Sequence, residues 1–258
     1  MKIAVLVKQV PDTETKIRIK PDGSGIEESD VKYVVSPYDE YAIEEAIKTR
    51  EKAGAGETVV ISLGPDRAVE TMRTALAMGI EKGIHLSTGG EVFDSYMTAK
   101  ALSKAIRDRG FDLILCGKQG IDADNAQVPA MIAALLDLPQ VMIVDKIDLK
   151  EDKLGALVTR RVAGGTKEIY DVTFPAVIGC DKGLNTPRYA SLPGIMKAKS
   201  KPVEKLQAKD LLEGATALVT LKNLQPPPER KAGKKIEGEP AIQARELARL
   251  LREEAKVI

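Results

Sequence analysis

The chain has little of the chemistry that metal centres and hydrolytic sites require. Its 258 residues include one histidine, two cysteines and no tryptophan. This composition argues against a zinc site built from cysteine and histidine, and no Ser/His/Asp or Cys/His catalytic group can be assembled. Cys116 and Cys180 lie in apolar runs and are expected to be reduced core residues of a cytosolic type of protein. His85 is expected to be a satisfied residue at a strand end rather than a catalyst, and we predict no metal.

The chain also lacks an excess of charge and an apolar run of membrane length. The net charge is +1, with 30% charged and 43% apolar residues, proportions typical of a soluble globular protein. This balance gives no general case for binding nucleic acid or an anionic membrane. We find no signal-peptide core, transit peptide or membrane-length apolar run, and expect a cytoplasmic bacterial protein without stable membrane insertion.

Neither a P-loop nor a GxGxxG fingerprint occurs, yet one stretch has the outline of an anion site. Residues 113–116 form a short apolar run, typical of a buried parallel strand, which stops at Gly117. An apolar stripe at helical spacing predicts a helix over 128–136. The loop between them and the free helix N-terminus can offer backbone N–H groups to an anion. The alternative is an ordinary strand–helix turn in which the helix is capped by Asp122, Asp124 or Asn125.

Strand and helix patterns alternate along the first half of the chain. Buried strands are predicted at 3–7, 58–63, 84–86 and 113–116, with a helical stripe after each. Successive strand–helix units indicate an α/β fold, with a parallel sheet covered by helices on both faces. Outside this pattern, residues 16–20 alternate as a half-buried strand that leads into a turn.

The first helix has a recognisable start. Ser36 fits the N-cap, Pro37 the first helical position, and Asp39 the third residue of a capping box. In open parallel sheets ligands bind beyond the carboxyl ends of the strands. The turn after Val7, the 36–39 cap and the Gly117 loop should meet at that edge, where Leu63 also ends its strand. Their convergence predicts a pocket of nucleotide size.

The pattern changes after Leu138. Residues 141–149, 157–162 and 168–174 read as added hairpin strands, followed by a buried strand at 175–180. From 183 to 202 the chain loses its periodicity, and its apolar and basic residues suggest either a binding surface or a loop docked on its own domain. A linker rich in proline and charge is predicted over 225–235, and an amphipathic helix over 241–255.

Four motifs together resemble the β subunit of electron transfer flavoprotein, over the chain from Lys2 to its end. They are Val5-Leu-Val-Lys-Gln-Val, Thr74-Ala-Leu-Ala-Met-Gly, Gly117-Lys-Gln-Gly-Ile-Asp and Asn185-Thr-Pro-Arg-Tyr-Ala-Ser-Leu-Pro-Gly-Ile-Met-Lys-Ala-Lys. The resemblance implies an adenine-nucleotide α-hydrolase-like domain at 1–183, a recognition loop at 184–202, and a C-terminal arm at 203–258 that packs on an α subunit.

The resemblance also implies a function. The family member is an electron carrier rather than an enzyme: it binds AMP and helps enclose the redox FAD of the α subunit. The heterodimer carries electrons from dehydrogenases, such as the acyl-CoA dehydrogenases of fatty acid β-oxidation, to a quinone oxidoreductase. The implied AMP site falls on Leu6, Ser36, Pro37, Tyr38, Asp39, Leu63, Gly117, Lys118, Gln119, Gly120, Ile121, Asp122, Ala123, Asp124, Asn125, Ala126, Gln127 and Val128. The implied docking residues are the anchor Leu192 and its neighbours Pro193, Ile195, Met196 and Lys197.

Two residues depart from the family pattern. Many AMP-binding members have Asn and Thr where this chain has Ala126 and Val128, and the stretch from Asp124 is closer to electron-bifurcating relatives with a second FAD. The recognition loop is closer to the AMP-bearing group, so AMP is favoured. A reading from another class, an enzyme that uses an adenine nucleotide, would need a Ser-Gly-Gly-type phosphate loop after the first strand. The chain has only Thr88-Gly-Gly-Glu, at the wrong place.

Overall fold

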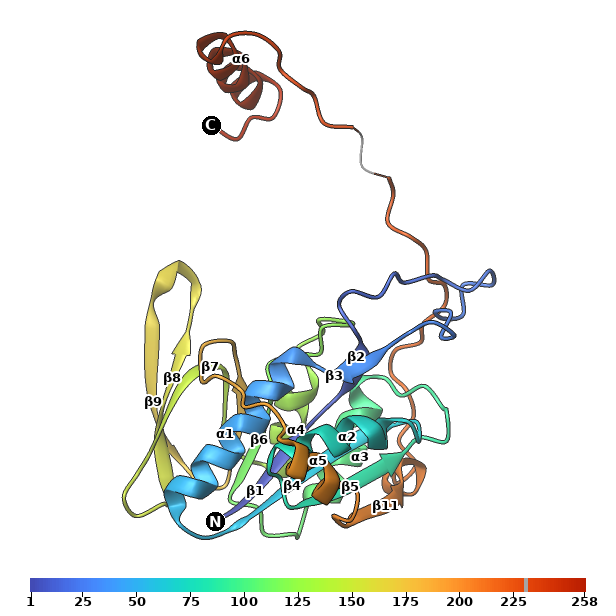
Figure 1. Ribbon diagram of the computed structural model, residues 1–258, viewed down its shortest axis with the longest axis vertical. Helices are drawn as coiled ribbons and strands as arrows, with labels where there is room; N and C mark the ends of the chain where they lie inside the picture. The colour runs from blue at the N-terminus through green and yellow to red at the C-terminus, as the bar shows by residue number, and fades with distance from the viewer. Residues whose placement is uncertain (230–231) are drawn as a thin grey trace.

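A computed structural model of the protein describes residues 1–229 and 232–258, and a nine-stranded sheet forms its centre (Figure 1). Across the sheet the order is β11 (Val203–Gln207), β5 (Lys82–Ser87), β4 (Glu57–Gly64), β1 (Lys2–Leu6), β6 (Leu113–Gly117), β10 (Ala176–Cys180), β7 (Gln140–Leu149), β8 (Gly155–Arg161) and β9 (Lys167–Thr173). The strands from β11 to β7 are parallel to one another, whereas β8 pairs antiparallel with both of its neighbours, β7 and β9. The predicted α/β fold with an added hairpin is thereby confirmed.

Helices cover both faces of the sheet, as the apolar stripes predict. One layer contains α1 (Pro37–Ala53) and α2 (Ala68–Met78), and the other contains α3 (Ser95–Ile106) and α4 (Val128–Leu136). The central strands are apolar on both sides because each face packs on one of these layers. For example, Val5 packs in the α1–α2 layer, while the adjacent Ala4 and Leu6 pack in the α3–α4 layer.

A long excursion separates β1 from α1. The short strands β2 (Gln9–Pro11) and β3 (Tyr33–Val35) pair with each other at its base. The predicted strand at 16–20 is wrong: only Ile19 forms an isolated bridge, with Ile26. Ile17 remains 49% exposed, so this alternating segment has no core against which a strand could pack. The predicted turn follows at 21–24, where Gly23 has a positive φ of 68°.

The C-terminal half contains two elements that no sequence pattern predicted. Within the predicted irregular loop, α5 (Leu192–Ala198) forms a short helix whose N-cap residue Ser191 accepts a hydrogen bond from the Gly194 backbone N–H at 3.2 Å. After the loop, β11 pairs with β5 at the sheet edge and leads into the 3-10 turn η2 (Ala208–Leu211). A second 3-10 turn, η1 (Ala163–Gly165), joins β8 to β9.

The predicted terminal helix is present as α6 (Pro240–Glu253), and it stands apart from the sheet (Figure 1). No residue of α6 is buried, and Ile242 and Leu247 of its apolar side are exposed. Residues 230 and 231 of the predicted linker lie outside the described residues; the other linker residues have no regular structure. In the described parts of the chain, no helix combines the length and hydrophobicity needed to cross a bilayer.

We predict that removing residues 225–258 leaves the melting temperature of the isolated chain within about 2 °C of its original value, because α6 buries none of its residues. Ending the chain at residue 202 instead should lower it clearly, since Ala208 and Leu212 are buried in the α3–α4 layer. Differential scanning calorimetry of the two truncated chains makes the comparison. A large drop on removing 225–258 alone would show that the arm stabilises its own domain.

Candidate functional site

Three neighbouring strands end together at one edge of the sheet. β1 lies between β4 and β6, and Leu6 is in register with Ile61 on one side and Cys116 on the other. The three strands are parallel, so their carboxyl ends open the same edge, as the sequence predicted. Leu6, Leu63 and Val128 lie in the α3–α4 layer beneath this edge and supply an apolar wall.

The carboxylate of Asp39 joins two of these strand ends. Its Oδ2 accepts a hydrogen bond from the Lys8 backbone N–H at 2.7 Å, and its Oδ1 accepts one from the Gly117 backbone N–H at 2.9 Å. The side chain is buried, and burial raises its pKa to about 7, although both backbone N–H groups favour the ionised form. The first turn of α1 is thus bonded to the ends of β1 and β6.

This arrangement corrects the predicted capping box. Ser36 is the N-cap and Pro37 lies at the helix start, but neither the Ser36 nor the Asp39 side chain caps the helix. Ser36 instead uses its backbone, which accepts from the Asp39 N–H at 2.8 Å and donates to the Lys8 carbonyl at 3.0 Å. Its Oγ is buried and has no hydrogen-bond partner among the described residues. The side chain of Asp39 is used for tertiary contact, which a local motif cannot reveal.

Gly117 is required by the crowding at this junction. A Cβ at this position would collide with Asp39 Oδ1 and with the Cβ and backbone of Tyr38. The strand therefore ends at a glycine because the helix start approaches its backbone too closely for any side chain.

The loop after Gly117 presents free backbone N–H groups. Ala126 has a positive φ of 52° and Gln127, the N-cap of α4, is right-handed with φ −101° and ψ −41°. Such alternation turns successive N–H groups toward one point, an arrangement that binds anions. Within the described residues, the N–H groups of Asn125, Ala126 and Gln127 donate to no protein acceptor. These groups and the N-terminus of α4 can together hold a phosphate.

The acidic residues of this loop do not cap the helix, so the predicted cap by Asp122, Asp124 or Asn125 is wrong. Asp122 pairs with Lys8 Nζ at 2.7 Å, and Asp124 accepts a hydrogen bond from Gln119 Nε2 at 2.6 Å. Asn125 donates to the hydroxyl of Ser95 at 3.3 Å, where the loop meets the start of α3. The exposed loop is thereby braced by its own side chains, while its backbone stays open.

Two residues of the rim were missed from sequence. Lys8 forms an ion pair with Asp122, and Asp181 forms one with Lys118 Nζ at 3.0 Å. The Lys118 Nζ also lies 4.7 Å from the centre of the Tyr38 ring. Asp181 directly follows β10 and Lys8 lies two residues after β1, and these positions were the available signal. Both lysines are paired with acidic residues. The positive potential available to an anion therefore comes from the free backbone N–H groups of the loop.

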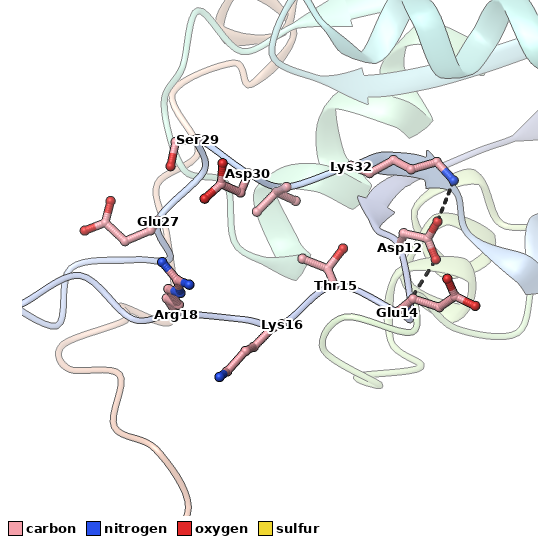
Figure 2. A pocket seen from close by; sticks show the side chains of 10 residues that line it. Asp12, Glu14, Thr15, Lys16, Arg18, Glu27, Ser29, Asp30 and Lys32 are labelled. Atoms are coloured by element: carbon pink, nitrogen blue, oxygen red, sulfur yellow. Dashed lines mark hydrogen bonds and ion pairs between the residues drawn. The ribbon is translucent and has the colours of Figure 1, made fainter.

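Figure 2 shows a separate hollow of about 500 Å³ in the excursion between β1 and α1. Its lining residues, from Asp12 to Arg18 and from Glu27 to Lys32, were not predicted as a site and are mostly charged. Asp12 and Lys32 lie 2.9 Å apart and face each other, and this hydrogen bond lowers the pKa of Asp12. None of the predicted site residues lines this hollow, which offers charges of both signs rather than an array of N–H donors.

A second predicted surface is carried by α5. The side chain of Leu192 is 73% exposed, and that of Met196 68% exposed, while Ile195, Pro193 and Lys197 are exposed beside them. The helix itself packs on α2, so closely that a side chain at Gly194 would collide with the Ala77 carbonyl. The loop thus docks on its own domain through its backbone, while its apolar side chains face outward and the binding surface stays a prediction.

The chain is similar to known proteins over most of its length. A family model described as "Electron transfer flavoprotein domain" matches residues 24–211. The mitochondrial electron transfer flavoprotein subunit beta of Arabidopsis thaliana is 45% identical over 90% of this chain and 92% of its own length. The subunit beta of Bacillus subtilis is 41% identical over the full length of both chains. That of Mus musculus is 41% identical over 92% of this chain and 93% of its own.

We predict that Asp39→Asn removes a pH dependence of stability between about pH 4 and pH 7. The folded-state pKa of Asp39 is raised from 3.8 to about 7, so in this window the folded chain binds more protons than the unfolded chain. The free energy of unfolding should fall as the pH rises, with a slope of up to about 1.4 kcal/mol per pH unit, and level off above pH 7. Urea titrations of the original chain and the variant give this slope as their difference.

Asp124→Asn is the control, an exposed carboxylate of the loop after Gly117 that should keep the pH slope. Parallel stability curves for the original chain and Asp39→Asn would contradict the titration of this group.

Proposed function

The chain belongs to the electron transfer flavoprotein family as a β subunit, and from that premise we propose that it is the nucleotide-holding and partner-docking half of a heterodimeric electron carrier. The proteins of this family carry electrons and are not enzymes in the usual sense. The observation that supports the proposal best is the open N–H array at Asn125–Gln127, above the strand ends joined by Asp39.

AMP is the nucleotide that we propose for this edge of the sheet. Its phosphate would accept hydrogen bonds from the N–H groups between Asp124 and Gln127, at the start of α4. Its adenine ring would lie against the apolar wall of Leu6, Leu63 and Val128. The residues present fit such a ligand, because one side of the site offers donors and the other offers an apolar surface.

A second FAD, as in electron-bifurcating relatives, is the alternative, and one observation favours it. Ala126 and Val128 carry no side-chain donor, so a phosphate here would be held by backbone groups alone. We place AMP first because those backbone groups converge on one small anion. The redox FAD, which supplies the electron-carrying chemistry when bound, would be held mainly by the α subunit.

We further propose that the recognition loop, residues 184–202, docks dehydrogenases, including acyl-CoA dehydrogenases of β-oxidation. Leu192 would be the anchor, with Pro193, Ile195, Met196 and Lys197 around it. A protruding apolar side chain beside lysines suits weak, rapid docking to several donors. The arm at 203–258 would pack on the α subunit through α6, whose apolar side is exposed. The heterodimer would pass its electrons to a quinone oxidoreductase and work in the bacterial cytoplasm.

We predict that the purified heterodimer releases one AMP and one FAD on denaturation, and that Ala126→Asp loses the AMP and keeps the FAD. An added carboxylate at Ala126 would face the phosphate among the free N–H groups. Chromatography of the released nucleotides gives both amounts. Ala163→Asp, exposed in the turn between β8 and β9, is the control and should retain AMP. Two FAD per heterodimer would establish the bifurcating alternative instead.

We predict that Leu192→Ala impairs reduction of the heterodimer by an acyl-CoA dehydrogenase and leaves its melting temperature nearly unchanged. Losing a docking anchor costs about 2 kcal/mol, or roughly thirtyfold in affinity, whereas truncating a core leucine costs roughly 2–5 kcal/mol of stability. Stopped-flow reduction and calorimetry separate the two effects. Leu154→Ala, a leucine with 68% exposure in the turn between β7 and β8, is the matched control. An unchanged reduction rate for Leu192→Ala would remove this residue from the docking surface.

A further inference from the structure

The recognition loop is tied to α1 by one arginine. The Arg188 guanidinium donates from Nε and Nη2 to the two oxygens of Glu44, at 2.8 and 3.0 Å, and from Nη1 and Nη2 to Glu51, at 2.9 and 3.1 Å. Its backbone N–H also donates to Glu44, at 3.1 Å. Glu44 and Glu51 are seven residues apart on α1, two helical turns, so the planar fork reaches both carboxylates on one face of the helix.

Glu44 depends on this contact. Its side chain is 5% exposed, and within the described residues its oxygens accept hydrogen bonds from Arg188 alone. A buried carboxylate without a partner is strongly unfavourable, so α1 and the loop hold each other. The next residue, Glu45, is also buried and accepts from Asn185 Nδ2 at 3.0 Å. Two adjacent buried acids on a helix are unusual, and here both face the stem of the loop.

The other limb of the loop is tied to α2. Arg73 of α2 donates to the carbonyls of Ala198, at 2.5 Å, and Lys201, at 2.8 Å. In return, Lys201 Nζ donates to the carbonyls of Leu76 and Ile80 at the end of α2, at 2.7 and 2.6 Å. Between the two limbs, α5 shows its apolar side chains to solvent. The loop is therefore held at both ends and exposed in the middle.

We propose that Arg188 is a positioning residue for partner docking, holding the recognition loop in its docking shape before the partner arrives. This inference rests on the proposed docking role of the loop. Arg188 precedes Leu192 by four residues and its guanidinium is turned toward α1, so it supports the apolar tip from behind. A segment ordered in advance loses less conformational entropy on binding, and weak docking depends strongly on that saving. The same pair explains why α1 carries a buried acid at position 44.

The test compares Arg188→Gln, Arg188→Lys and the milder Glu51→Gln in the assembled heterodimer. Steady-state reduction by an acyl-CoA dehydrogenase, with the heterodimer as the varied substrate, should show KM raised about tenfold for Arg188→Gln and kcat unchanged. Arg188→Lys keeps the charge and loses the guanidinium fork, so its KM should lie between those of the original chain and Arg188→Gln. Glu51→Gln should raise KM less than Arg188→Gln does. Glu213→Gln is the matched control, because Glu213 pairs with Lys100 and Lys104 on the opposite face of the sheet.

Hydrogen exchange gives a readout that needs no partner. In the free heterodimer, amides of residues 189–199 should exchange about tenfold faster in Arg188→Gln than in the original, while those of α3 and β6 stay unchanged. Chemical reduction of the FAD by dithionite should be unaffected. If Arg188→Gln fails to assemble, Glu51→Gln carries the test with the same directions of change.

The outcomes are distinct. A raised KM with faster exchange in the loop supports the inference. An unchanged KM for Arg188→Gln, while Leu192→Ala is impaired, overturns the inference and leaves the docking role standing. Faster exchange with KM unchanged in both variants overturns the docking role of the loop, and the inference with it. Unchanged exchange in the loop shows that Arg188 does not order it and also overturns the inference.

Discussion

The candidate nucleotide site depends on a single buried carboxylate. Asp39 receives the N–H groups that β1 and β6 leave unpaired where they diverge, and these two bonds set the first turn of α1 against both strands. The cost of burying the charge is visible in its raised pKa. The close approach also explains Gly117, since no side chain fits between the strand end and Tyr38. The loop from Lys118 to Gln127 starts from this junction, so its direction is set there.

The sequence predicts the elements that follow from hydrophobic periodicity. It misses the features that depend on contacts between segments distant in the chain. The continuous apolar runs of β1, β4 and β6 indicated a parallel sheet, and parallel strands must end at a common edge. The predicted capping box is wrong because the Asp39 side chain bonds to the backbone of Lys8 and Gly117 instead of its own helix. The local motif at residues 36–39 gives no sign of these distant partners. The strand at 16–20 failed because alternation predicts a strand only where a core lies beneath it. The segment Val203–Gln207 became β11 because β5 had a free edge, which no local pattern can show.

The nucleotide edge and the docking helix lie at different ends of the same layer. Helix α1 begins beside Gly117, at the carboxyl ends of the strands, and α2 returns from that edge toward their amino ends. The recognition loop contacts Leu76 and Ala77 near the end of α2, and Ile80 just after that helix. A nucleotide on the N–H array would therefore lie away from Leu192. Such a ligand would act on stability and on the orientation of α1 and α4, rather than by contact with a docked dehydrogenase.

The two candidate surfaces also differ in how their charges are paired, and each arrangement suits the ligand proposed for it. At the nucleotide edge Lys8 and Lys118 are neutralised by Asp122 and Asp181, which leaves backbone dipoles to hold an anion. Fixed dipoles at a helix start are short in range and select by shape, which suits a ligand that stays bound. On the recognition loop Arg188 is paired with Glu44 of α1, while Lys197 and Lys199 are exposed around the apolar tip. Exposed charges act over about 10 Å and are screened by salt, which suits a partner that must arrive and leave quickly.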